Sequence, residues 1–175
     1  MLHLLFYSLC FFWIAEFFIK TKQQTVQKDS SFYLILFAVI AIIATASITA
    51  NTIDVYFIQL LGVLLFGFGI FLRYWSIKSL GKAFTRGIDV KQDMVLSSKG
   101  PYKVLRHPLY VGLGLIALGF ALFMQSPVAI IMSLTLFPIA LWIRIRKEES
   151  ALELILKDRY EQWKKSRWIV IPWIY

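Results

Sequence analysis

The chain has 175 residues, of which 59% are apolar and 17% are charged. A soluble domain is about 45–50% apolar and about 25% charged, so this composition excludes a water-soluble domain, a disordered chain and a collagen-like repeat. Cys10 is the one cysteine, which excludes a disulfide scaffold, and the mean hydropathy of +0.69 predicts an integral-membrane protein.

Five apolar segments follow one another along the chain and approach the roughly 17–25 residues that a membrane-spanning helix needs. They are Leu2–Ile19, Phe32–Ala50, Val55–Leu72, Leu109–Met124 and Val128–Ile143. The linker Gln125–Pro127 between the last two is so short that it predicts a tight helical hairpin. We therefore predict an all-α membrane protein with five transmembrane helices and a C-terminal hairpin.

The basic residues are distributed unevenly between these segments. All 19 Lys and Arg residues lie in positions 20–28, 73–106 and 144–167, which share one side if every segment crosses the membrane. Because cytoplasmic loops are enriched in Lys and Arg, the N-terminus is predicted outside and the C-terminus in the cytoplasm. The same residues explain the net charge of +9 through anionic lipid headgroups, without a nucleic-acid partner.

Two cytoplasmic segments remain, Arg73–His107 and Arg144–Tyr175. The first has apolar anchors but little helical periodicity. The second begins as a continuation of the fifth helix, with Arg144 and Glu148 on one face, and its helical propensity runs on to about Trp163. The apolar ending is too short to span a membrane, and its Trp and Tyr residues suit the membrane interface.

The start of the fourth span carries a candidate site. Pro108 suits a first helical turn because it lacks the N–H that such a turn leaves unpaired. The helix start can bind an anion, and His107 can add a ring nitrogen. The alternative is that Arg106 and His107 only flank the span at the interface. Arg144 and Glu148 are similarly either a solvated pair or part of a cluster with Tyr102 and His107.

Other chemistries find little support. Two histidines, one of them His3, predict no metal site, and the chain has no phosphate-binding loop, dinucleotide glycine pattern or serine elbow. The second to fifth spans carry no ionisable residue at their centres, unlike most channels and transporters.

Two motifs in order carry a family resemblance. The first combines Gly100-Pro101-Tyr102 with Arg106-His107-Pro108, Tyr110 and Gly112, and the second, past the hairpin, combines Arg144 with Glu148-Glu149. Together they resemble the isoprenylcysteine carboxyl methyltransferase family over roughly residues 60–172. The short chain looks most like the small bacterial members, which implies a multi-pass protein of a bacterial cell membrane.

The resemblance implies an S-adenosyl-L-methionine-dependent methyltransferase with cytoplasmic cofactor-binding segments. It assigns cofactor contacts to Met94, Val95, Leu96, Ser97, Tyr102, His107, Tyr110 and Glu148. Arg144 would bind the methyl acceptor, and Arg144 and His107 would be the catalytic residues. The catalytic region is expected at 55–175, after a two-helix membrane region at 1–54. The acceptor would be a lipophilic molecule or lipidated substrate, with either an isoprenylcysteine-type carboxylate or the acidic hydroxyl of a lipid or polyketide.

Two alternatives remain open at this point. One is an NADPH-dependent membrane reductase of sterol-reductase type, whose extra phosphate the loop lysines could bind. The other is a non-enzymatic membrane adaptor, in which Arg144 and Glu148 would tolerate alanine. The sequence does not decide the oligomeric state.

Overall fold

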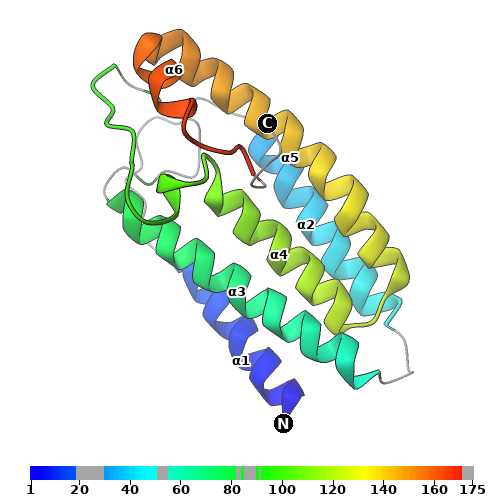
Figure 1. Ribbon diagram of the computed structural model, residues 1–175. Coiled ribbons are helices and arrows are strands. Elements are labelled where there is room, and N and C mark those ends of the chain that lie inside the picture. Colours follow the sequence, from blue (N-terminus) through cyan, green and yellow to red (C-terminus); the bar gives the residue numbers. More distant parts are fainter. Residues whose placement is uncertain (19–29, 51–54, 82–83, 85–89, 91, 171–175) are drawn as a thin grey trace.

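The computed structural model describes residues 1–18, 30–50, 55–81, 84, 90 and 92–170. In these residues the chain forms helices, as predicted, and the five apolar ones run alongside one another (Figure 1). They are α1 (Leu2–Ala15), α2 (Ser30–Ile48), α3 (Tyr56–Leu80), α4 (Pro108–Phe123) and α5 (Pro127–Leu156). Shorter helical segments are η1 (Glu16–Phe18), η3 (Gly100–Lys103) and α6 (Asp158–Lys164).

Three helices in the described part of the chain are long and apolar enough to cross a membrane: Ser31–Ile48, Tyr56–Leu80 and Pro127–Leu156. Helices α1 and α4 are apolar but shorter. All five helices lie where the sequence predicted them, whereas the crossing of the membrane by all five stays a prediction.

One helix boundary differs from the prediction, and one predicted helical stretch contains a break. Helix α3 continues to Leu80 rather than Leu72, because there is no Gly or Pro between Leu72 and Gly81, where φ is +54°. The prediction that helical structure runs on to about Trp163 is confirmed, with one break: α5 ends at Leu156, and α6 begins after Lys157, whose φ is +46°, and ends at Lys164. Because of this break, the Tyr160 side chain packs against Leu152 and Leu156 and is fully buried.

The predicted hairpin between α4 and α5 is confirmed. Gln125 adopts a φ of +50°, and the Ser126 hydroxyl caps α5 by accepting a 3.1 Å hydrogen bond from the Ala129 N–H. The Gln125 side chain also accepts a 3.1 Å bond from the Val55 N–H, which ties the hairpin to the start of α3.

Glycine pairs set the contact between α3 and α4. A Cβ on Gly62 would lie 2.8 Å from the Gly119 carbonyl oxygen, and a Cβ on Gly69 would lie 2.6 Å from that of Gly112. Each pair therefore lets the two backbones approach more closely than any side chain would allow. The structure therefore uses these four glycines for packing within the chain.

Helix α4 lies between two pairs of helices. It contacts α3, α5 and α2, while α1 packs on α3 and α2 packs on α5. The ends of α1, α3 and α5 and the starts of α2 and α4 share one end of the bundle, together with η3 and α6 (Figure 1). We call this the basic end, because both predicted cytoplasmic segments meet there.

Candidate active site

A cavity of about 440 Å³ opens at the basic end, and side chains from α1 to α6 line it. Its volume is in the range of about 300–1,000 Å³ that small-molecule sites occupy. The structure brings most of the predicted site residues into its wall: Met94, Leu96, Ser97, Tyr102, His107, Tyr110, Arg144 and Glu148. The side chain of Val95 is not among the lining groups and is exposed.

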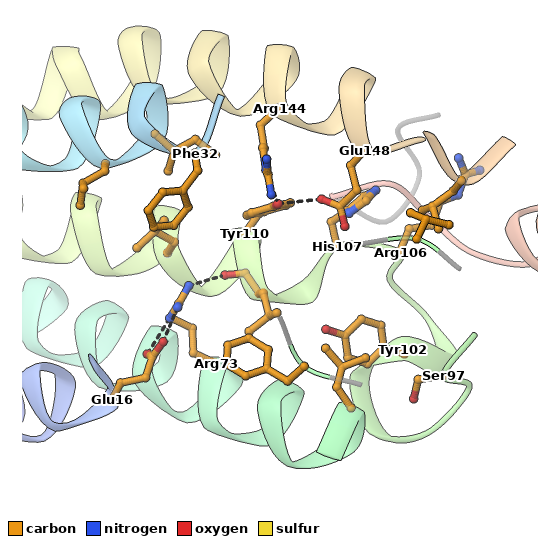
Figure 2. Close-up of a pocket in the computed structure, with 18 of the residues that line it drawn as sticks. Glu16, Phe32, Arg73, Ser97, Tyr102, Arg106, His107, Tyr110, Arg144 and Glu148 are labelled. Atoms are coloured by element: carbon orange, nitrogen blue, oxygen red, sulfur yellow. Dashed lines mark hydrogen bonds and ion pairs between the residues drawn. The ribbon is translucent and has the colours of Figure 1, made fainter. Parts of the chain in front are cut away.

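Tyr110 connects the two predicted binding residues of α5. Its hydroxyl accepts a 2.9 Å hydrogen bond from Arg144 Nε and donates a 2.7 Å bond to Glu148 Oε2 (Figure 2). The Arg144 side chain is buried, with the residue only 3% exposed. Arg144 and Glu148 are therefore not the solvated surface pair that the sequence allowed as an alternative.

A serine of α2 also holds Arg144. The Arg144 Nη1 donates a 3.0 Å hydrogen bond to the Ser31 hydroxyl, which is buried at the start of α2. Sequence reasoning missed Ser31, because a serine ahead of an apolar run is typical of an ordinary helix start. Its role depends on α2 packing against α5, which no local pattern reveals.

Glu149 is the centre of a second polar cluster. Its Oε1 lies 3.3 Å from Arg106 Nη1 and 3.3 Å from His107 Nε2, and it accepts a 3.0 Å bond from the Tyr160 hydroxyl. The His107 ring stacks on Tyr110 with the ring centroids 5.6 Å apart. The motif contained Glu149 without a role, and the structure makes it the residue that orients His107.

Several amide groups around the start of α4 have backbone partners. The Arg106 N–H donates to the Trp168 carbonyl at 2.8 Å and the His107 N–H to the Ile169 carbonyl at 3.2 Å. The Tyr110 N–H bonds within its own turn to His107, and Pro108 has no N–H. The tail therefore occupies the two amide groups just ahead of α4, and the anion site at this helix start stays a prediction.

Helix α6 and the tail hold the loop that precedes η3. Arg159 donates to the Gln92 carbonyl at 2.8 Å, and the Trp163 Nε1–H donates to the Ser97 carbonyl at 3.2 Å. Arg167 Nε donates to the Tyr102 carbonyl at 2.7 Å. Burial, reinforced by the charge of Glu148, raises the pKa of Tyr102, so its phenol remains protonated at neutral pH.

The other part of the cavity is apolar. Its wall is a face of α2, joined by single residues of α1 and α4: Phe32, Ile35, Leu36, Val39, Ile40 and Ile43, with Trp13 and Leu113. Figure 2 shows Phe32 pointing toward the centre of the site. The cavity thus combines charged groups at one end with hydrocarbon at the other, which suits an amphipathic ligand.

Glu16 and Arg73 form an ion pair in the cavity wall. The Arg73 Nε donates a 2.7 Å bond to Glu16 Oε2, and Nη1 donates a 3.1 Å bond to the Leu109 carbonyl (Figure 2). Sequence reasoning placed Arg73 in the loop and gave Glu16 no role. The only available signal was an acidic residue near the end of an otherwise apolar segment.

The sequence profile of the phospholipid methyltransferase family matches residues 57–159, more than half of the chain. The chain belongs to this family. Within the family, it is 34% identical over 104 residues to the protein-S-isoprenylcysteine O-methyltransferase of Schizosaccharomyces pombe, covering 56% of this chain and 42% of that protein. It is also 35% identical over 82 residues to the YpbQ protein of Bacillus subtilis, covering 47% and 49%.

A solved structure, that of the eukaryotic intramembrane Ras methyltransferase ICMT (isoprenylcysteine carboxyl methyltransferase), has a similar fold. Its TM-score is 0.65 at 21% identity, over 86% of this chain and 55% of that one. The resemblance to the isoprenylcysteine carboxyl methyltransferase family is therefore confirmed. This phospholipid methyltransferase family member spans about half the length of the relatives it matches.

Proposed function

We propose that this chain is an integral-membrane, S-adenosylmethionine-dependent O-methyltransferase that acts on a lipophilic acceptor. The observation that carries the proposal is the single cavity in which a charged end and an apolar end meet beside Arg144. Membership of a methyltransferase family supports the reaction class. The groups in the cavity wall support binding of both the cofactor and the acceptor.

The chemistry of the charged end fits the cofactor. The Glu148 carboxylate can bind an ammonium group or ribose hydroxyls, and the rings of Tyr102, Tyr160 and Trp163 line the same cavity and can hold an adenine or a sulfonium cation. Met94, Leu96 and Ser97 complete this wall, whereas Val95 is not among its lining residues. When bound, S-adenosylmethionine supplies an electrophilic methyl group.

Arg144 and His107 have different parts in this proposal. Arg144 orients the acidic oxygen of the acceptor, because a guanidinium binds a carboxylate through two parallel hydrogen bonds. His107, which Glu149 orients, stacks on Tyr110 and lies beside the cofactor. Methyl transfer needs the two reactants held in near-attack geometry, and an acceptor that is already anionic needs no general base.

The apolar wall of α2 supports an acceptor with a hydrocarbon chain, either an isoprenylcysteine-type carboxylate or the acidic hydroxyl of a lipid or polyketide. Such an acceptor would enter from the bilayer. We further propose that all five apolar helices cross a bacterial cell membrane, with the N-terminus outside and the basic end in the cytoplasm among anionic lipids. Region 55–175 would be catalytic, and region 1–54 would complete the acceptor wall.

The test is calorimetric titration of the detergent-solubilised protein with S-adenosylhomocysteine, beside NADPH. We expect micromolar binding of S-adenosylhomocysteine that Glu148→Ala abolishes. Glu153→Ala is the matched control, because Glu153 is exposed on the same helix and pairs with Lys164 at 2.7 Å, outside the cavity. Binding of NADPH instead would identify a reductase, and a folded sample that binds neither would favour an adaptor.

A further inference from the structure

Arg73 is held in the cavity wall by contacts to two other elements. Its guanidinium meets both carboxylate oxygens of Glu16, after α1, and also the Leu109 carbonyl in the first turn of α4. Both side chains are largely buried, with 15% of Arg73 and 7% of Glu16 exposed. The pair brings one positive and one negative charge to the cavity in addition to the residues of the two motifs.

The backbone of α4 makes room for Arg73. A Cβ on Gly112 would lie 2.6 Å from Arg73 Cγ, so any larger residue would displace the arginine stem. Gly112 belongs to the motif that the sequence analysis singled out. Because Gly112 has no side chain, the Arg73 stem can lie against the backbone of α4 and its guanidinium can reach the cavity. Gly112 therefore has a role beyond helix packing.

The position of Arg73 matches the boundary between the two ends of the cavity. Along α4, His107 and Tyr110 belong to the charged end and Leu113 belongs to the apolar end. Arg73 binds the Leu109 carbonyl, in the same helical turn as Tyr110 and one turn before Leu113. Arg144 and Arg73 approach this level from opposite sides, one from α5 and the other from α3 (Figure 2). The head of an amphipathic acceptor would lie between the two guanidinium groups.

The charges of the wall favour an anionic acceptor. Arg73, Arg106 and Arg144 are balanced by Glu16, Glu148 and the Glu149 that pairs with Arg106. The cofactor carries a net positive charge, so an acceptor with an acidic oxygen keeps the filled cavity neutral. A phospholipid amine accepts a methyl group only as the neutral amine, so its nucleophilic atom would offer the guanidinium groups no negative charge to bind.

We propose that Arg73 is a second residue that positions the acidic oxygen of the acceptor, opposite Arg144, and that Glu16 occupies its guanidinium until the acceptor binds. This inference rests on the proposed function. Glu16 and an incoming carboxylate present the same chemistry to the guanidinium, so the acceptor replaces one ion pair with another. The acceptor class is thereby narrowed to lipophilic molecules with an ionised oxygen.

The experiment compares two probes that differ only in charge, N-acetyl-S-farnesylcysteine and its methyl ester, by calorimetric binding to the full chain with S-adenosylhomocysteine present. Arg73→Met should weaken binding of the carboxylate roughly 10- to 100-fold, because it removes a charge-assisted contact, and should leave binding of the ester within about twofold. Arg146→Met is the control, because Arg146 lies over the Trp142 ring on the exposed face of α5.

Glu16→Gln should change binding of the carboxylate probe in the opposite direction to Arg73→Met. It removes the competing carboxylate, so binding of the farnesylcysteine carboxylate should tighten roughly fivefold, whereas a merely structural pair would weaken it or leave it unchanged. If Arg73→Met does not fold, and for that reason does not bind S-adenosylhomocysteine, Glu16→Gln decides the question.

Several results would overturn the inference. Equal weakening of acid and ester by Arg73→Met would mean that Arg73 only supports the fold. Tighter binding of phosphatidylethanolamine than of the carboxylate would identify an amine acceptor. If the unmodified chain binds S-adenosylhomocysteine but not the carboxylate, the inference fails alone; if it binds neither, the proposed function fails first.

Discussion

The Tyr110 hydroxyl connects the two charged groups of the site, because it accepts a hydrogen bond from Arg144 and donates one to Glu148. The Glu148 carboxylate and the Arg144 guanidinium lie one helical turn apart on α5. If the Tyr110 hydroxyl were absent, they would pair directly with each other. Such a direct pair would occupy both of the groups that we assign to the two ligands. Tyr110 therefore keeps the two charges separate while it holds both in place.

Tyr110→Phe removes this hydroxyl and keeps the ring. We expect S-adenosylhomocysteine affinity and turnover to fall together, by roughly 10-fold or more, because two hydrogen bonds to charged groups are lost. Calorimetry and a methyl-transfer assay on the same preparation measure this. Tyr74→Phe is the control, since the Tyr74 hydroxyl donates to the Phe12 carbonyl at 2.8 Å in an exposed position. Unchanged affinity and turnover in Tyr110→Phe would contradict this role.

The motif residues could be identified from sequence, but several of their contacts could not. Tyr110, Arg144 and Glu148 stand in a recognisable order. In contrast, Ser31 contacts Arg144 across 113 positions of sequence, and a pairing at such a distance depends on which helix faces meet.

At the scale of elements, the glycines between α3 and α4 give a stability prediction. A Cβ on Gly119 would lie 2.6 Å from the Phe66 backbone nitrogen and 2.7 Å from the Gly62 carbonyl oxygen. Gly119→Ala should therefore force the helices apart and lower the free energy of unfolding by about 1–3 kcal/mol, as overpacking does. Thermal unfolding in detergent measures the change.

Gly67→Ala is the matched control, because Gly67 is also a glycine of α3 but faces α1 rather than α4. Its Cβ would meet only the Leu9 side chain at 3.5 Å, an ordinary contact, so alanine should stabilise α3 by up to about 1 kcal/mol through helix propensity. We therefore expect Gly119→Ala to lower the free energy of unfolding and Gly67→Ala to raise it. Similar effects of both would mean that the close approach at Gly119 does not limit packing.

The break between α5 and α6 also makes a prediction. Lys157 has a φ of +46°, a conformation that costs a non-glycine residue roughly 1–2 kcal/mol. Lys157→Gly should raise the melting temperature, although the greater freedom of glycine in the unfolded chain offsets part of the gain. Lys165→Gly should lower it, because Lys165 has a helical φ of −57°. A lower melting temperature in Lys157→Gly would mean that the Lys157 side chain stabilises the break.

At the scale of the whole molecule, the predicted topology places the basic end in the cytoplasm. Cys10 is the one native cysteine, so a Cys10→Ser background allows single reporters. We expect Lys103→Cys and Lys165→Cys to be protected from a membrane-impermeant thiol reagent in intact cells. Val55→Cys and Val128→Cys, at the opposite end of the bundle, should be labelled. The reverse pattern would invert the topology, and labelling of both ends on one side would contradict five spans.

The sequence by itself determined the class, the five apolar helices, the hairpin and the family, because hydrophobic length, linker length and motif order are local properties. Most of the site residues that it indicated line the cavity. The tertiary structure decided which glycines face each other, how Glu149 orients His107, and that Glu16 and Arg73 enter the cavity beside the motifs. These features depend on helix faces brought together from distant parts of the chain, and the energy of such packing appears only when the whole bundle is assembled.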